Sequence, residues 1–163
     1  MKKTVFIYFS YSGDNDKLAE LFKQQLGCDI LKLEPMTEYT HNSIKILFQG
    51  GSESIRKKSP ELKSYHFNSA DYEAIIIGTP VWAWTFSPPL RTFMLENEIK
   101  NKQIYLTCTH RGSPGNTIQN LREFFSDNEI ILTKEIHAPI GEKENIELFF
   151  EEVKIKLNKK DNE

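Results

Sequence analysis

Two tryptophans lie one residue apart beyond a buried-strand pattern, and their indoles are suited to stacking on a flat ligand. Residues 74–78 form a continuous apolar, β-branched run, which predicts a strand buried on both faces of a parallel sheet. We expect this strand to end at Gly78-Thr79-Pro80, because proline cannot pair within a central strand. Trp82 and Trp84 then follow its carboxyl end, where open α/β sheets bind ligands. The alternative is that both indoles seal the top of the core.

A second candidate binding element follows the strand predicted over residues 4–9. Its residues are Ser10, Tyr11, Ser12, Gly13, Asp14 and Asn15. The two serine hydroxyls can donate hydrogen bonds, the glycine permits close backbone approach, and the next helix directs its first N–H groups at the loop. The loop is therefore a candidate phosphate site. A plain serine–glycine turn, with Asp14 as the N-cap of the helix, is the alternative.

A third loop, residues 109–116, follows a strand predicted over 103–108. It contains two glycines, a proline and several side-chain donors, so it can surround the polar edge of a planar ligand. An exposed glycine–proline connection is the alternative. Because the carboxyl ends of parallel strands share one edge of a sheet, we expect the three loops to meet there. Together they indicate a phosphorylated planar cofactor.

The elements that must position these loops alternate between strand and helix. Strands are predicted over 4–9, 29–33, 74–78, 103–108 and 130–133, and apolar stripes predict helices over 18–26, 88–94, 118–125 and 146–157. Ile44, Leu47 and Phe48 suggest a further short helix within the least regular segment, residues 34–70. This alternation predicts an α/β fold, with one parallel sheet covered by helices on both faces in a single domain, 1–163.

Composition narrows the functional classes. The net charge is −2 with mixed signs, which argues against a nucleic-acid-binding surface. No apolar stretch approaches the ~20 residues of a membrane span, and we expect a cytoplasmic protein with no membrane partner. Cys28 and Cys108 are expected to be small buried residues, and the four histidines lack metal-ligand spacing, so no metal site is predicted.

Several nucleotide-binding and phosphoacceptor classes are excluded by the residues present. The chain contains no GxxxxGK[ST] motif, and no GxGxxG follows the first strand. A receiver domain needs carboxylates where this chain has Ser10 and Gly78-Thr79 at the ends of its first and third strands.

These motifs resemble the flavodoxin family. The family's S-x-[ST]-G-N-T loop is matched by residues 10–15, and its YDxIxxGxPxW stretch by residues 71–82. Residues 88–93 and 109–117 also fit, and the resemblance is weakest over 34–70. It implies a flavodoxin-like three-layer sandwich, with a five-stranded parallel sheet of order 2-1-3-4-5, and non-covalent FMN at its carboxyl edge.

The resemblance also implies roles for individual residues. The FMN phosphate would be held by Ser10, Tyr11, Ser12, Gly13 and Asn15, and the isoalloxazine would be lined by Val81, Trp82, Ala83 and Trp84, with Thr79 and Pro80 beside them. Thr109, His110, Arg111 and Gly112 would lie on its other side, where the Arg111 cation would stabilise an anionic reduced ring. No catalytic side chain is implied, since the flavin performs the redox chemistry.

The chain departs from the family pattern at Asp14 and Asn15, where the family has Asn and Thr. A carboxylate beside a phosphate dianion is repulsive and costs up to ~4 kcal/mol at ~4 Å and an effective dielectric near 20, less if Asp14 turns outward. One hydroxyl donor is also lost. We therefore expect weakened FMN binding.

Three functions remain open. The first is an FMN-binding redox protein that transfers electrons to a partner protein or a small-molecule acceptor. The second is an NAD(P)H-dependent quinone or small-molecule reductase. The third is a flavodoxin-like binding module that has lost tight FMN binding. The sequence leaves both a monomer and a homodimer open.

Overall fold

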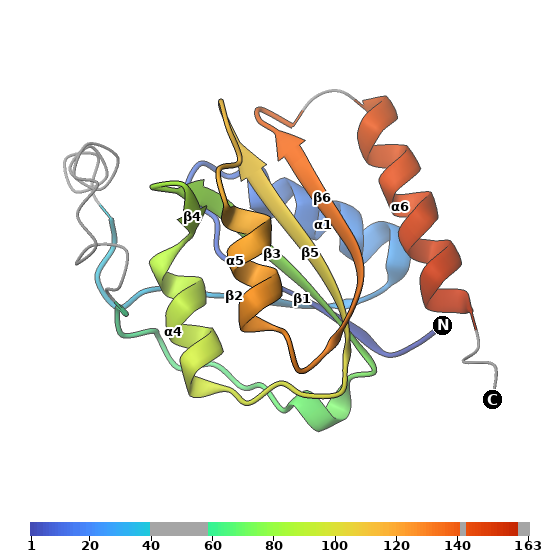
Figure 1. The fold of residues 1–163 in the computed structure, drawn as a ribbon, viewed down its shortest axis with the longest axis horizontal. Coiled ribbons are helices and arrows are strands. Elements are labelled where there is room, and N and C mark those ends of the chain that lie inside the picture. Colours follow the sequence, from blue (N-terminus) through green and yellow to red (C-terminus); the bar gives the residue numbers. More distant parts are fainter. Residues whose placement is uncertain (40–58, 141–142, 160–163) are drawn as a thin grey trace.

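The chain alternates between strands and helices, as its sequence predicts (Figure 1). The computed structural model describes residues 1–39, 59–140 and 143–159, so the short helix predicted around 44–48 lies outside the described residues. The elements are β1 (Thr4–Tyr8), α1 (Asp14–Leu26), β2 (Asp29–Lys32), a 3₁₀ turn η1 (Ser69–Asp71), β3 (Ala74–Trp82), β4 (Thr85–Phe86), α4 (Pro88–Glu96), β5 (Gln103–His110), α5 (Thr117–Phe124), β6 (Glu129–His137) and α6 (Lys143–Asn158).

The sheet has the predicted strand order. Five parallel strands run β2-β1-β3-β5-β6, which is the order 2-1-3-4-5 once the short strand β4 is set aside. β4 was not predicted from the sequence, and it pairs with the end of β3 in antiparallel fashion. The consecutive isoleucines 75–77 are fully buried, as expected for a central strand covered on both faces.

Helices cover both faces of the sheet, and the two cores follow from the alternation of side chains along each strand (Figure 1). Val5 and Ile7 of β1 pack in one core with Phe93 of α4, on the side that α5 also covers. Phe6 packs in the other core with Phe22 of α1, on the side that α6 also covers. Each fully buried side chain of this size contributes roughly 1.5–3 kcal/mol.

The expectation that β3 ends at Gly78-Thr79-Pro80 is wrong, because the strand continues to Trp82. Pairing between β1 and β3 stops at Tyr8 and Gly78, so at Thr79 and Pro80 the strand that pairs with β3 is β5. Pro80, opposite Thr109, therefore lies on a local edge where its missing N–H is tolerated. β5 likewise continues through Thr109 and His110, which the sequence placed in a loop.

Other sequence signals are confirmed. Gly27 ends α1 in the left-handed conformation, and its N–H donates to the Lys23 carbonyl. Pro88 occupies the first turn of α4.

Cys28 and Cys108 are buried, and burial raises the pKa of these thiols to about 11 and about 12, so both stay protonated at neutral pH. Within the described part of the chain, no helix is long and apolar enough to cross a bilayer.

Candidate functional site

The loops after β1, β3 and β5 meet at the carboxyl edge of the sheet, as the sequence predicts. Between them lies a cleft of about 290 Å³, lined by Tyr11, Ser12, Asp14, Pro80, Val81, Trp82, Thr109, His110, Arg111 and Ala138. A second hollow of about 230 Å³ shares Val81, His110 and Arg111 with it and is completed by Ala83, Trp84, Gly112 and Ser113. Because the two hollows share these three residues, they adjoin and form one candidate binding surface.

Four predicted site residues do not line this surface: Ser10, Gly13, Asn15 and Thr79. Thr79 is fully buried, and its hydroxyl accepts a hydrogen bond from the backbone N–H of Ser87 at 2.9 Å, directly before α4. Its side chain thus fixes the start of a helix, whereas its neighbour Pro80 faces the cleft.

The segment after β6 also reaches the cleft, although none of its residues was among the predicted site residues. Ala138 lines the cleft, and the backbone N–H of Ile140 donates to Asp14 at 3.3 Å. The predicted parallel sheet already indicated this position. All strands of a parallel sheet end at the same edge, so the segment after the last strand lies there too.

The two tryptophans have different environments. Trp82 is only 4% exposed, stacks on Phe9 with ring centroids 5.8 Å apart and contacts the edge of Tyr39 at 4.8 Å. It belongs to the core and also forms a wall of the cleft, so sealing the core does not prevent its indole from facing the cleft. Trp84 is 60% exposed and lies in the turn between β3 and β4.

That turn is held in a conformation that is unfavourable for its residues. Ala83 and Trp84 have φ values of +48° and +67°, whereas such two-residue hairpin turns normally contain asparagine and glycine. Each non-glycine residue in this region costs about 1–3 kcal/mol. The loop after β5 supports the turn, because the Asn116 N–H donates to the Trp84 carbonyl at 3.0 Å.

The predicted phosphate loop has most of its side chains engaged within the protein. Gly13, with φ of +86°, is the N-cap of α1, so the suggestion that Asp14 is the cap is wrong. The Ser10 hydroxyl accepts from the Asp16 N–H at 3.3 Å. The Asn15 amide donates to the Phe9 carbonyl at 2.9 Å, so its side chain points toward the end of β1. The Asn15 amide nitrogen is therefore already engaged within the protein.

Asp14 points into the protein and is bound from three directions. Its carboxylate accepts hydrogen bonds from the Ser12 hydroxyl, from Arg111 Nη2 at 2.9 Å and from the Ile140 N–H at 3.3 Å. Burial raises the pKa of Asp14, but these hydrogen bonds and the Arg111 charge outweigh it and hold the pKa below its ordinary value. Asp14 is therefore ionised at neutral pH and links three loops.

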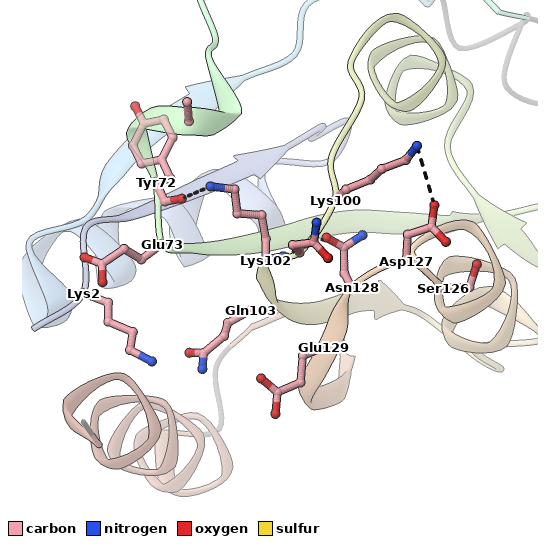
Figure 2. Close-up of a pocket in the computed structure, with 12 residues that line it drawn as sticks. Lys2, Tyr72, Glu73, Lys100, Lys102, Gln103, Ser126, Asp127, Asn128 and Glu129 are labelled. Carbon is pink, nitrogen blue, oxygen red and sulfur yellow. Dashed lines mark hydrogen bonds and ion pairs between the residues drawn. The ribbon is translucent and has the colours of Figure 1, made fainter. Parts of the chain in front are cut away.

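A larger cavity, about 950 Å³, lies at the opposite edge of the sheet (Figure 2). Its walls are mostly polar: Lys102 Nζ donates to the Tyr72 carbonyl at 2.8 Å, and Lys100 lies 4.0 Å from the Asp127 carboxylate. It contains none of the predicted site residues, and ligands of open α/β sheets bind at the carboxyl edge. The smaller cleft is therefore the candidate functional site. The described residues contain no group of three or more His, Cys, Asp or Glu side chains able to hold a metal ion.

Fold and site together define an α/β protein with strand order 2-1-3-4-5 and a candidate ligand cleft where the order reverses, between β1 and β3. The family model described as Flavodoxin matches residues 3–153. The chain belongs to the flavodoxin family, as its motifs suggest.

Solved structures share the fold at low sequence identity. A protein from Bacteroides eggerthii superposes with a TM-score of 0.72 at 22% identity, covering 93% of this chain and 97% of that one. A flavoprotein from Lactobacillus acidophilus, solved in complex with FMN, gives 0.66 at 20% identity, covering 83% and 93%. A flavodoxin, WrbA-like protein from Agrobacterium tumefaciens gives 0.64 at 15% identity, covering 96% and 98%. No curated protein sequence matches the chain significantly.

Proposed function

We propose that this protein binds FMN without a covalent bond in the carboxyl-edge cleft and transfers electrons between redox partners. The observation that carries the proposal is an aromatic-walled cleft directly beside the amino terminus of α1, in a member of the flavodoxin family. The FMN complex of the Lactobacillus acidophilus flavoprotein, which shares this fold, supports the choice of cofactor.

The residues present fit the ring of a flavin. Tyr11 and Trp82 supply aromatic surface for stacking. His110 Nδ1 is buried and has no hydrogen-bond partner among the described residues, so the polar edge of a bound ring could pair with it. When bound, FMN would supply the electron-transfer chemistry, while the protein orients the ring and tunes its potential. The first N–H groups of α1 would hold the phosphate, apart from that of Asp16, which donates to Ser10.

A second candidate function is an NAD(P)H-dependent reductase, and the adjoining hollow favours it. Ala83, Trp84, Gly112 and Ser113 enclose space beside the main cleft, where a second planar group could approach the flavin. Reduction of bound flavin by NAD(P)H alone would support the reductase. Reduction by dithionite but not by NAD(P)H would support the electron carrier.

The first test is a visible absorption spectrum of the purified protein after incubation with excess FMN and desalting. Retained flavin with a shifted spectrum and quenched fluorescence supports the proposal, and a colourless protein overturns it in favour of a flavin-free binding module.

Trp84→Ala should weaken FMN binding, because the exposed indole borders the cleft. Phe124→Ala removes another partly exposed aromatic ring, from α5, and serves as the matched control.

A further inference from the structure

We propose that the Asp14–Arg111 ion pair determines how strongly the cleft distinguishes FMN from riboflavin, the same ring system without a phosphate. The Asp14 carboxylate opposes the phosphate and Arg111 offsets it, so discrimination in favour of FMN is weak. This inference rests on the proposed function, because it concerns the flavin site.

Asp14 lies where a bound phosphate would approach α1. It is the first residue of α1, immediately after the Gly13 cap, and so lies at the helix terminus that would receive a phosphate. It already accepts the Ser12 hydroxyl, which lines the cleft. Because a hydroxyl donates one proton, Ser12 cannot serve Asp14 and a phosphate at the same time.

A second acidic residue strengthens this effect. Asp16 also lies in the first turn of α1, and its carboxylate contacts Lys32 Nζ at 2.7 Å and accepts the Tyr8 hydroxyl at 2.9 Å. Carboxylates in the first turn satisfy the positive end of the helix dipole. The carboxylates of Asp14 and Asp16 therefore already neutralise part of the positive helix terminus. This lowers its attraction for a phosphate dianion.

Arg111 supplies the opposing charge. Its side chain is 59% exposed, whereas that of Asp14 is 5% exposed, so the guanidinium covers a buried carboxylate from the solvent side. It also lines both hollows of the cleft. Removing either member should therefore change the binding of a charged flavin, and the two changes should have opposite signs.

The experiment measures dissociation constants of FMN and riboflavin by quenching of flavin fluorescence. Asp14→Asn should tighten FMN binding about tenfold, and Arg111→Gln should weaken it by a similar factor, with riboflavin changing less than about threefold in both. Matched controls are Glu20→Gln, an exposed acid further along α1, and Arg122→Gln on α5, which should leave the ratio of the two constants unchanged.

The outcomes separate this inference from the proposed function. Opposite shifts of the FMN-to-riboflavin ratio in Asp14→Asn and Arg111→Gln support the ion pair as the selector. Tight flavin binding with the same FMN-to-riboflavin ratio in every variant overturns the inference and leaves the proposed function intact. A wild-type protein that binds neither flavin overturns both. The wild-type protein also tests the inference without any variant: a preference for FMN above about a thousandfold would contradict it.

Discussion

At the scale of single residues, the cleft depends on positions where the backbone passes very close to its neighbours. Gly115 has a φ of +56°, and a Cβ added there would lie 2.7 Å from the Trp84 carbonyl oxygen and 2.8 Å from the Trp84 Cα. Since both contacts are to backbone atoms, no side-chain movement can relieve them. Gly115 thus permits the loop after β5 to support the turn between β3 and β4.

Gly115→Ala should therefore destabilise the protein by about 2–4 kcal/mol, from backbone strain together with the forced displacement of the turn. Urea unfolding measures the effect. Gly112→Ala is the matched control, because a Cβ at Gly112 meets nothing within 4 Å, and it should change stability by less than ~0.5 kcal/mol. Equal losses in the two variants would contradict the steric explanation.

At the scale of elements, β3 and β4 form a hairpin that projects beyond the parallel sheet and carries one wall of the binding surface. Val81 pairs with Phe86, and Trp82 with Thr85. The pairs leave only Ala83 and Trp84 for the turn, both with positive φ. The strain of the turn is balanced by contacts with the loop after β5 and with α5, where the Asn120 amide donates to the Thr85 hydroxyl at 2.7 Å.

Ala83→Gly should relieve part of this strain and stabilise the protein by about 1 kcal/mol, because glycine adopts positive φ without a Cβ clash. Thermal unfolding should show a rise in Tm of several degrees. The same substitution at Ala74, buried in the regular part of β3, should lower Tm. A loss of stability in Ala83→Gly would show that the turn is not strained.

At the scale of the whole molecule, much of the fold but only part of the site was predictable. Runs such as Ile75–Ile77 and stripes such as Leu18, Phe22 and Leu26 define elements locally, so strand order and layers followed. The β3 extension was missed because whether Pro80 is tolerated depends on where β1 ends. The Asp14–Arg111 contact joins residues 97 apart in sequence, so no pattern within a single helix or strand could predict it.

Lowering the pH should reduce the free energy of unfolding through two carboxyls in the first turn of α1, those of Asp14 and Asp16. Burial raises the pKa of Asp14 and Asp16, but hydrogen bonds and cations outweigh it, and both values lie below the ordinary 3.8. A carboxyl whose folded pKa is lowered stabilises the protein above its unfolded pKa and loses that contribution as pH falls through the folded pKa.

Urea unfolding should therefore show stability falling from about pH 5 toward pH 3, with a smaller fall in Asp14→Asn. At pH 7 this variant should be less stable than the wild type, and the difference should shrink in acid, where the wild-type carboxyl is protonated. Parallel pH profiles for the two proteins would exclude the role given to the Asp14 carboxylate.

The hydrogen bond from Ile140 to Asp14 spans 126 residues, and this separation has a consequence for biosynthesis. At ~5–20 residues per second, a ribosome adds Ile140 about 6–25 s after Asp14. The nascent chain therefore lacks one of the three bonds to Asp14 until the segment after β6 emerges, and we expect cofactor loading to follow synthesis of that segment. Ribosome-bound chains ending before residue 129 should leave FMN fluorescence unquenched, and quenching by such chains would show that the cleft assembles without β6.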